Sequence, residues 1–287
     1  MNKTIWMYWE NKKGSTKPAY LDMCLESIIK HSPNYDVVVL DEKTVFEYLP
    51  DLRTDINKIV DIAHKADYIR ARMIHKFGGI WLASDVVLLK EIEIEKYLDA
   101  FEYVGSSSEY GKPSIWFFGG VKNCEILKKW YLQMDKILDV KLNKTYKKSF
   151  KQKKYLYLSI MFKYINIFNL SGLEKKKEKF NKKYLHKVSR LGALGWSEIG
   201  YDILWKLFEN YKYKNIEFEK FAPLKFDQWK EFFKNNISLK DLLKDETISV
   251  MLYNKFMFEP LKDMSREEIL KSNNLLGQVF RYSLSNK

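Results

Sequence analysis

The sequence predicts an α/β protein, a sheet flanked by helices, with a lysine-rich helical insert. Three observations support this fold class. Residues 4–41 have the pattern of a strand, an amphipathic helix and a second strand, and residues 55–89 that of a longer helix, a Gly-Gly pair and a third strand. The 287 residues are 46% hydrophobic, enough for one large α/β domain or a core domain with an insert.

The first unit begins at residues 4–9, Thr-Ile-Trp-Met-Tyr-Trp, an aromatic run typical of a buried strand. Pro18 then opens a helix that is predicted to continue through Lys30. Its apolar face carries Tyr20, Leu21, Cys24, Leu25 and Ile28. A Ser-Pro-Asn break follows, and the apolar run at 36–41 is typical of a parallel strand.

The second unit begins with a helix predicted over residues 55–77. Its apolar positions follow helical spacing: Ile62, Ala66, Ile69, Met73 and Phe77. Gly78-Gly79 ends this helix as a left-handed cap. Residues 80–89 then form a third strand that contains a polar interruption.

The later elements are shorter. Strands are predicted at 103–105 and 114–118, and helices at 125–137 and 202–209. We expect loops at 192–200 and 221–229, and a strand or loop at 247–258. Three regions result: an α/β core at 1–140, a basic helical insert at 141–190, and a part at 191–287 that completes the core and the candidate site.

The positive charge of the chain is concentrated in the insert. The whole chain has a net charge of +13, and residues 141–190 hold 16 lysines and arginines but only two acids, Glu174 and Glu178. The remainder is therefore close to neutral. An aromatic centre at 155–170 between lysine-rich flanks suits an interfacial helix pair on anionic lipid. A solvated lysine surface over a buried helix fits equally well, and no nucleic-acid-binding module accompanies the charge.

Several protein classes are disfavoured by the sequence. Cys24 and Cys124 cannot form a disulfide framework or a zinc site, so a reducing cytoplasmic setting is expected. The N-terminus lacks the apolar run of a signal peptide, and no segment has the ~18 uninterrupted apolar residues of a spanning helix. The four histidines are scattered, and there is no P-loop, no nucleophile elbow and no GxGxxG.

The most informative stretch is residues 66–85. Asp67 and Arg70 are three residues apart in the predicted helix, so their side chains share a face. Asp85 follows the third strand and is expected at the carboxyl edge of the sheet, where open α/β sheets bind ligands. A guanidinium suits phosphate charge, and carboxylates suit sugar hydroxyls or a divalent cation. The alternative is a helix-surface ion pair between Asp67 and Arg70, worth about 0.3–0.5 kcal/mol.

This stretch resembles glycosyltransferases grouped as capsular-polysaccharide-synthesis and glycosyltransferase-32-like proteins. Ala-Asp-Tyr-Ile-Arg at 66–70 and Gly-Gly-Ile-Trp-Leu-Ala-Ser-Asp-Val at 78–86 are similar to their helical Asp and Arg, Gly-Gly turn and strand-end aspartate-any-aspartate (DxD) motif. Four further segments are similar to the family: 5–14, 28–42, 115–120 and 194–200. The resemblance covers nearly the first 130 residues and patches thereafter.

The resemblance implies a GT-A fold, in which a Rossmann-like sheet binds a sugar nucleotide. By position, the implied donor-binding residues are Trp6, Tyr8, Asp67, Arg70, Ala83, Ser84, Asp85 and Asn254. Trp6 would lie against the base, Asp67 and Arg70 would contact the donor sugar and phosphates, and Asp85 would bind Mn²⁺ or Mg²⁺. Arg70 and Asp85 are the catalytic candidates, because Arg70 and any metal would stabilise the leaving diphosphate.

Two positions depart from the family pattern. Ala83 stands where the first strand-end aspartate is expected, and Met251 stands where a histidine often lies near the diphosphate. Hard divalent cations prefer several oxygen ligands, so both departures weaken the expected metal site. Asn254 and the donor's own phosphates are the compensating ligands.

The resemblance implies transfer of a sugar to a hydroxyl of a growing polysaccharide, generally with retention and without an evident base. The acceptor would be an oligosaccharide or lipid-linked glycan, reached from the cytoplasm or the inner membrane face. Trp116, Trp196 and Glu198 are acceptor candidates. Three of these residues have a structural alternative: core packing for Trp6 and Trp116, and a loop contact for Glu198. The alternative function, suggested by Ala83, is a catalytically impaired scaffold in a membrane-associated assembly complex.

Overall fold

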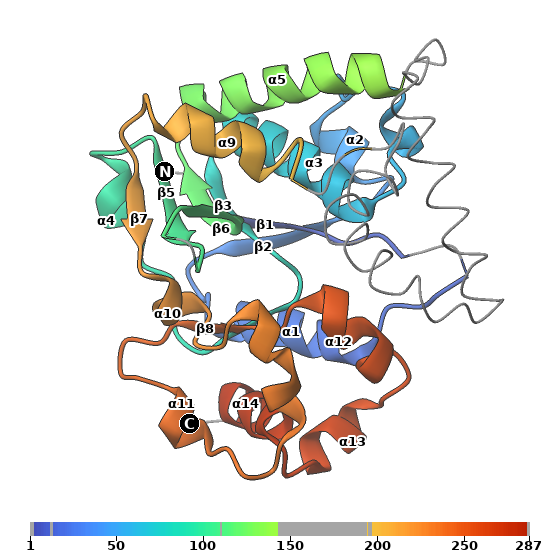
Figure 1. Cartoon of the computed structure of the whole chain (residues 1–287), viewed down its shortest axis with the longest axis vertical. Coiled ribbons are helices and arrows are strands. Elements are labelled where there is room, and N and C mark those ends of the chain that lie inside the picture. Colours follow the sequence, from blue (N-terminus) through green and yellow to red (C-terminus); the bar gives the residue numbers. More distant parts are fainter. Residues whose placement is uncertain (1–2, 12–13, 110, 143–193, 195–196, 286–287) are drawn as a thin grey trace, which may run out of the picture.

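The computed structural model describes residues 3–11, 14–109, 111–142, 194 and 197–285. Its centre is a six-stranded sheet with the strand order β2-β1-β3-β6-β5-β7 (Figure 1). In that order, the strands are Asp36–Leu40, Thr4–Tyr8, Gly79–Leu82, Pro113–Gly120, Tyr103–Ser107 and Lys214–Ile216. Only β6 runs antiparallel to its neighbours. The predicted class, an α/β protein with a Rossmann-like sheet flanked by helices, is confirmed.

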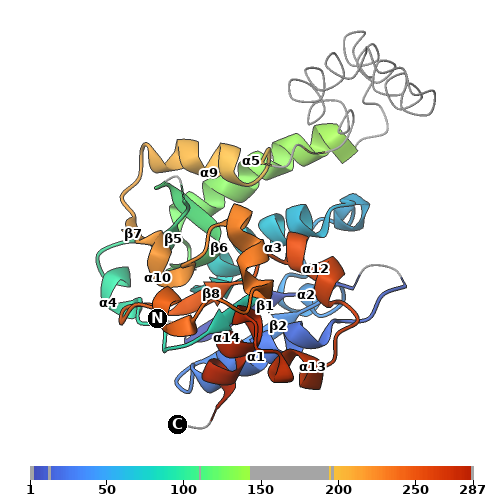
Figure 2. The ribbon, with the colours of Figure 1, turned by 60° about the horizontal axis from the view of Figure 1, so that its bottom comes forward.

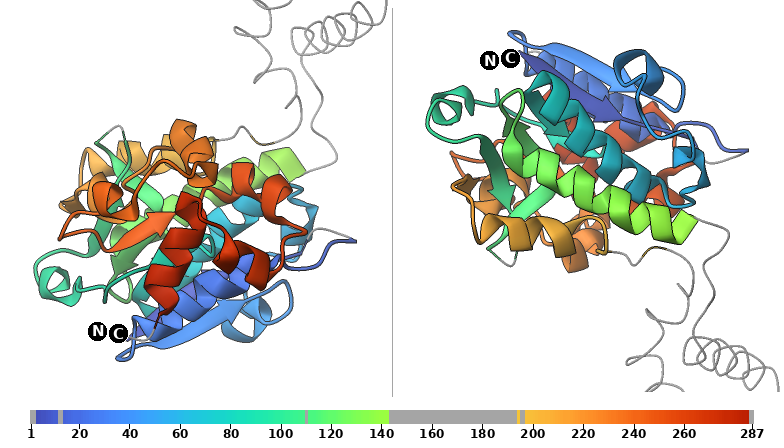
Figure 3. Two further views of the ribbon diagram at one scale, coloured as in Figure 1. Left: turned by 90° about the horizontal axis from the view of Figure 1, so that it is seen from below. Right: turned by 90° about the horizontal axis from the view of Figure 1, so that it is seen from above.

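Helices cover both faces of the sheet (Figures 1 and 3). One face carries α3 (Ile62–Phe77), α5 (Glu125–Leu142) and α9 (Tyr201–Phe208). The other side carries α1 (Ala19–Lys30), α12 (Asn254–Leu261), α13 (Arg266–Lys271) and α14 (Leu275–Leu284). The shorter helices are α2 (Val45–Tyr48), η1 (Ile56–Lys58), α4 (Glu95–Leu98), α10 (Phe218–Phe221), η4 (Phe226–Phe233) and α11 (Leu239–Leu242).

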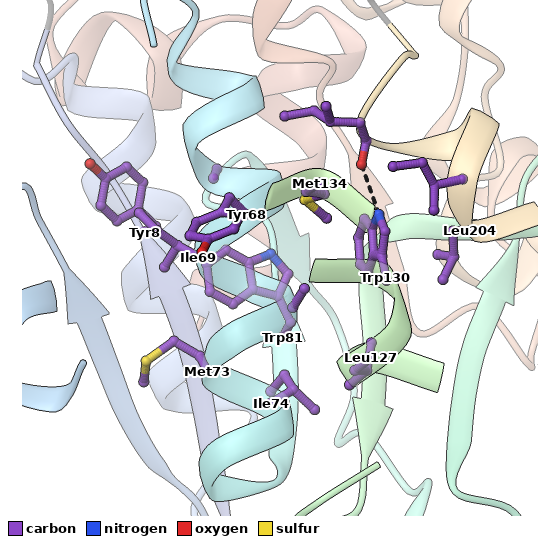
Figure 4. Packing of buried hydrophobic residues seen from close by; sticks show 14 of the residues in the cluster. Tyr8, Tyr68, Ile69, Met73, Ile74, Trp81, Leu127, Trp130, Met134 and Leu204 are labelled. Atoms are coloured by element: carbon purple, nitrogen blue, oxygen red, sulfur yellow. Dashed lines mark hydrogen bonds between the residues drawn. The ribbon is translucent and has the colours of Figure 1, made fainter. Parts of the chain in front are cut away.

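Strand β1 shows how the aromatic run at 4–9 is divided between two cores. Trp6 and Tyr8 pack with α3 on one face, whereas Ile5 and Met7 pack on the other. This alternation is the period of two that an extended strand imposes. Figure 4 shows the first core, where α3, α5 and the sheet meet. There the indole N–H of Trp130 donates to the carbonyl of Ile199 at 2.7 Å.

The predicted strand at 80–89 is two strands in the structure. β3 ends at Leu82, a turn follows over residues 83–85, and β4 (Val86–Leu88) pairs antiparallel with β8 (Ser249–Met251) in a separate sheet. The polar interruption is the point of division, because the backbone N–H of Ala83 still reaches Trp116 O at 2.8 Å before the chain leaves the main sheet. This departure carries Asp85 towards the C-terminal region.

Several other boundaries differ from the predicted ones. Helix α3 begins at Ile62 rather than at 55, because Asp61 caps it by accepting from Ala63 N at 3.0 Å. Helix α5 extends to Leu142. The loop predicted at 221–229 holds the end of α10 and part of η4, and residues 247–258 hold β8 and the start of α12.

The C-terminal region and α1 form a core of their own. Tyr20, Leu21 and Cys24 of α1 are buried with Leu276 and Val279 of α14. Lys30 at the end of α1 donates to Ser283 O at 2.8 Å. Apart from Lys141 and Leu142, which end α5, the predictions for the basic insert fall outside the described residues. Within the described ranges, no helix combines the length and apolar character needed to cross a bilayer.

Candidate functional site

Helix α3 presents Asp67 and Arg70 to the interior of the protein. The two residues are only 4% and 8% exposed, and Arg70 Nη2 lies 3.3 Å from Asp67 Oδ1. The alternative of a helix-surface ion pair is therefore excluded, since both partners are buried. Burial of an ion pair costs several kcal/mol of desolvation per ion. This cost is offset only when the geometry of the pair is good.

The guanidinium of Arg70 is held by three groups besides Asp67. Its Nε donates to Ala66 O at 3.1 Å, Nη1 donates to Ile115 O of β6, and Cζ lies 5.3 Å from the ring centroid of Trp81. These contacts fix the plane of the guanidinium between α3 and the sheet. Among the described contacts, Nε and Nη1 each donate a hydrogen bond and Nη2 forms the ion pair with Asp67, so the guanidinium retains N–H donors for a ligand.

Asp85 joins the end of the main sheet to α12. Its side chain is 7% exposed, and Oδ2 accepts from the backbone N–H of Asn254 at 2.6 Å. Its carbonyl accepts from Leu252 N at 2.9 Å. Asn254 is the first residue of α12, and its side-chain oxygen accepts from the phenol of Tyr20. A carboxylate at a helix N-terminus interacts favourably with the helix dipole.

The three predicted charges belong to one electrostatic environment. Burial raises the pKa of Asp67, and Arg70 and His64 oppose that shift. Burial also raises the pKa of Asp85, opposed by the N–H of Asn254 and by the charge of Arg70. Arg70 thus acts on both carboxyls, although its ion pair is with Asp67.

Two tyrosines that sequence reasoning missed lie in the same environment. Burial raises the pKa of Tyr201 to about 12, against a hydrogen bond from the backbone of Ile115, and Asp67 and Arg70 act on it electrostatically. Burial raises the pKa of Tyr253, and the charges of Glu109 and Asp85 add to the shift. Tyr253 has φ +57°, a left-handed conformation that turns β8 into α12.

The backbone at Gly200 explains how Tyr201 reaches this place. A Cβ at Gly200 would lie 2.8 Å from Asp67 Oδ2 and 3.1 Å from Ile115 Cδ1, so any other residue there would require these side chains to shift. The bond from Trp130 to Ile199 O fixes the preceding carbonyl. In the sequence, the Gly195–Gly200 segment predicts only a loop and does not identify Tyr201 as a site residue.

Trp6 and Tyr8 of β1 both have partners within the protein. Trp6 is 4% exposed, donates from its indole to Gly78 O at 3.0 Å, and packs 5.2 Å from Tyr48 in an edge-on geometry. It lies in the core, as its structural alternative stated. Tyr8, at the carboxyl end of β1, donates to Glu10 Oε2 at 2.6 Å, and Lys65 donates to the same oxygen at 2.6 Å.

Two of the three acceptor candidates, Trp116 and Glu198, lie in the described part of the chain. Trp116 is half-buried and packs 6.3 Å from Phe221. Glu198 forms an ion pair with Lys141 at 3.2 Å, which is the structural role considered for it. Trp196 lies outside the described residues. Ala83 and Ser84 form the partly exposed turn before Asp85.

The strand end offers few protein ligands for a cation. In the part of the chain that the structure describes, no three His, Cys, Asp or Glu residues are grouped to hold a metal ion. Asp85 is the one carboxylate at the described turn; the backbone N–H of Asn254 binds it, and the Asn254 amide oxygen accepts from the phenol of Tyr20. This donor set fits a Mg²⁺ or Mn²⁺ ion that shares substrate phosphates, because such ions are commonly bound by one or two carboxylates plus phosphate oxygens. It does not fit a cation held by protein alone.

Asp85→Asn is expected to raise the free energy of unfolding at pH 7–8, because burial of Asp85 disfavours its charged form. The pKa of Asp85 in the folded protein lies above the ordinary value of an aspartate, so the parent protein loses stability as the pH rises from that ordinary value towards the folded pKa. Asparagine can still accept from Asn254 N without this loss. Urea unfolding between pH 4 and 8 measures the difference.

The exposed Asp263→Asn is the matched control and should follow the parent protein at every pH. A difference between Asp85→Asn and the parent protein that does not vary with pH would contradict a buried, ionising carboxyl at this position.

A protein-family model matches the first three quarters of the chain. Residues 1–222 match the family model described as "Capsular polysaccharide synthesis protein". No curated protein matches the sequence. Residues 223–287, which supply Tyr253 and Asn254, lie beyond the family match.

Three solved structures are similar in part. The glycosyltransferase GlyE of Streptococcus pneumoniae TIGR4 is 13% identical with a TM-score of 0.44, and its apo form is 12% identical with a TM-score of 0.42. Each match covers 99% of this chain and 61% of the GlyE chain, so the chain spans about three fifths of that length. "PaToxG Glycosyltransferase" is 13% identical, with a TM-score of 0.39 and coverage of 97% and 85%. On the extent of the family match, this chain belongs to the capsular polysaccharide synthesis protein family.

Proposed function

We propose that this protein is a glycosyltransferase, a hexosyl- or related transferase. It would move a sugar from a nucleoside-diphosphate sugar to a hydroxyl of a growing capsular or other cell-surface polysaccharide. The family match supports a role in capsule synthesis, and the buried charges provide the chemistry. The proposed acceptor is an oligosaccharide or lipid-linked glycan, with the inner membrane face as a peripheral location. Retention of anomeric configuration is part of the proposal.

The observation that carries the proposal is the buried Arg70, which pairs with Asp67 on its own helix and acts electrostatically on Asp85 after β3. Strands β1 and β3 are parallel, so their carboxyl ends lie at one edge of the sheet. Ligands of open α/β sheets bind at this edge. The buried Asp67–Arg70 pair favours a functional role, since replacement of buried ion pairs by apolar residues is often neutral or stabilising.

Arg70 suits a diphosphate that gains negative charge as the glycosidic bond of the donor breaks. Its guanidinium is already fixed by Ala66 O, Ile115 O and Asp67, so little reorganisation is needed to receive that charge. Because the charge is larger in the transition state than in the bound donor, the interaction favours the transition state. Asp67 and Tyr201 are placed to bind sugar or ribose hydroxyls.

A divalent cation is part of the proposal only as a partner of the donor. Asp85 would hold it, with Asn254 as an amide ligand, and the cation would supply further positive charge to the phosphates. Since the Asp85 carboxylate already binds the start of α12, metal affinity without nucleotide should be weak.

Isothermal titration calorimetry with UDP, GDP and ADP, each with and without Mn²⁺, tests the proposal. We expect one nucleoside diphosphate to bind with micromolar affinity and Mn²⁺ to strengthen that binding, because the cation shares its ligands with the phosphates. Mn²⁺ titrated alone should give little heat. No binding of any of these nucleotides under either condition would contradict the donor site.

The second candidate is the catalytically impaired scaffold, favoured by Ala83 at the position of an expected aspartate. The scaffold binds nucleotide but transfers nothing. Incubation with a panel of sugar nucleotides and a mixture of capsular oligosaccharides separates the two candidates, because only the enzyme produces free nucleoside diphosphate together with a lengthened glycan.

A further inference from the structure

An aromatic shelf lies beyond the family-matching region, on η4 and α12. It consists of Phe226, Trp229 and Phe256. The ring centroids of Trp229 and Phe256 are 5.7 Å apart with planes 9° from parallel, and those of Phe226 and Phe256 are 6.3 Å apart with planes 21° from parallel. The three rings therefore lie nearly parallel, with Phe256 between the other two.

One end of the aromatic shelf packs against the protein, and the other end is exposed to solvent. Trp229 packs edge-on against Phe233 at 6.1 Å, next to the buried core of the C-terminal region. Phe226, at the opposite end, is 43% exposed. Lys230 Nζ lies 5.8 Å from the Trp229 ring centroid, and Lys255 Nζ lies 5.8 Å from that of Phe256. The shelf thus combines exposed aromatic surface with ammonium groups at its edges.

The shelf is joined directly to the candidate site. Phe256 is two residues after Asn254, whose N–H binds Asp85, so it lies about 3 Å further along the axis of α12. Tyr253 donates to Leu224 O at 2.5 Å and ties the chain before η4 to the start of α12. In Figures 1 and 2, α12 lies near the central strands on the side opposite α5. A ligand on the shelf would therefore contact the same helix whose first residue binds Asp85.

We propose that the aromatic shelf binds a sugar unit of the acceptor glycan, on a chain that carries carboxylate or phosphate groups. This inference rests on the proposed function, because it places the acceptor next to the donor. The apolar C–H face of a pyranose covers an aromatic ring, as amphipathic ligands do at sites lined by aromatic residues with a few polar groups. The ammonium group of Lys230 complements acidic substituents.

Binding to an array of bacterial surface oligosaccharides, acidic and neutral, tests the shelf. We expect acidic glycans to bind, and Phe226→Ala to weaken that binding about five- to tenfold, the loss that one aromatic contact gives. Lys230→Ala should weaken acidic glycans more than neutral ones. Leu132→Ala is the matched control, because Leu132 of α5 is also 43% exposed, and it should change nothing.

Calorimetry with nucleoside diphosphates on the same variants keeps the two proposals distinct. Phe226→Ala should leave nucleotide affinity unchanged. If no nucleotide binds while glycan binding still depends on Phe226, the proposed donor site is contradicted and the proposed role of the aromatic shelf is supported. The proposal of a glycan-binding aromatic shelf is contradicted if no glycan on the array binds in a way that depends on Phe226. It is also contradicted if Phe226→Ala loses only binding to anionic vesicles or only self-association.

Discussion

Replacing Arg70 with alanine is expected to reduce nucleoside-diphosphate affinity by at least about 100-fold, the loss typical when one partner of a buried, hydrogen-bonded charge pair is removed. The guanidinium is buried, pairs with Asp67, and its charge lowers the pKa of Asp85 against the effect of burial. Without it, a diphosphate would meet two carboxylates and no compensating charge. Calorimetry with the best-binding nucleotide measures the loss.

The same substitution leaves Asp67 buried without its partner, which costs about 3–5 kcal/mol of folding stability. Arg70→Gln with Asp67→Asn is the companion variant, since it removes both charges together and retains hydrogen-bonding groups. We expect it to fold and still not bind. Arg72→Ala is the control, because Arg72 pairs instead with the exposed carboxylate of Asp51. Wild-type affinity in the folded companion variant would contradict a role for Arg70 in donor binding.

Gly79→Ala is expected to destabilise the protein by about 3 kcal/mol or to prevent folding. Its φ is +101°, which an alanine adopts only with strain of about 1–2 kcal/mol. The added Cβ would also lie 2.5 Å from the carbonyl oxygen of Thr4 and 3.1 Å from the indole nitrogen of Trp6. Overpacking of this kind adds about 1–3 kcal/mol, because β1 cannot move without leaving β2 and β3.

Gly14→Ala isolates the conformational part of that effect. Gly14 also has a positive φ, +82°, but nothing lies within 4 Å of the added Cβ, so a loss of about 1 kcal/mol is expected. Urea unfolding of both variants compares them. Equal stabilities would show that the close approach of β1 to residue 79 is unimportant.

Much of the N-terminal fold could be predicted because its patterns are local. The first strand, α1, β2 and the Gly-Gly end of α3 follow from apolar periodicity and helix-stop residues. The division of residues 80–89 could not be predicted, because β4 is paired by β8, some 160 residues later. The ends of α10, η4 and α12 depend in the same way on contacts with distant residues.

The candidate site was only partly predictable for a related reason. Asp67 and Arg70 share a helix face, and Asp85 follows an apolar strand, so spacing alone identified them. Tyr201 and Tyr253 have no distinguishing sequence pattern, since their positions depend on Gly200 and on a left-handed residue after β8. The resemblance implies that Trp6 lies against the nucleotide base, whereas its indole N–H donates to Gly78 O within the core.

The core shared by α1 and α14 also affects the order in which this chain can fold. Lys30 and its acceptor at Ser283 are 253 residues apart, and the apolar face of α1 is covered by the same distant helix. During synthesis, α1 therefore emerges long before its covering partner exists. Contacts of such high sequence separation close slowly, and until they do this hydrophobic face is open to chaperones and to aggregation.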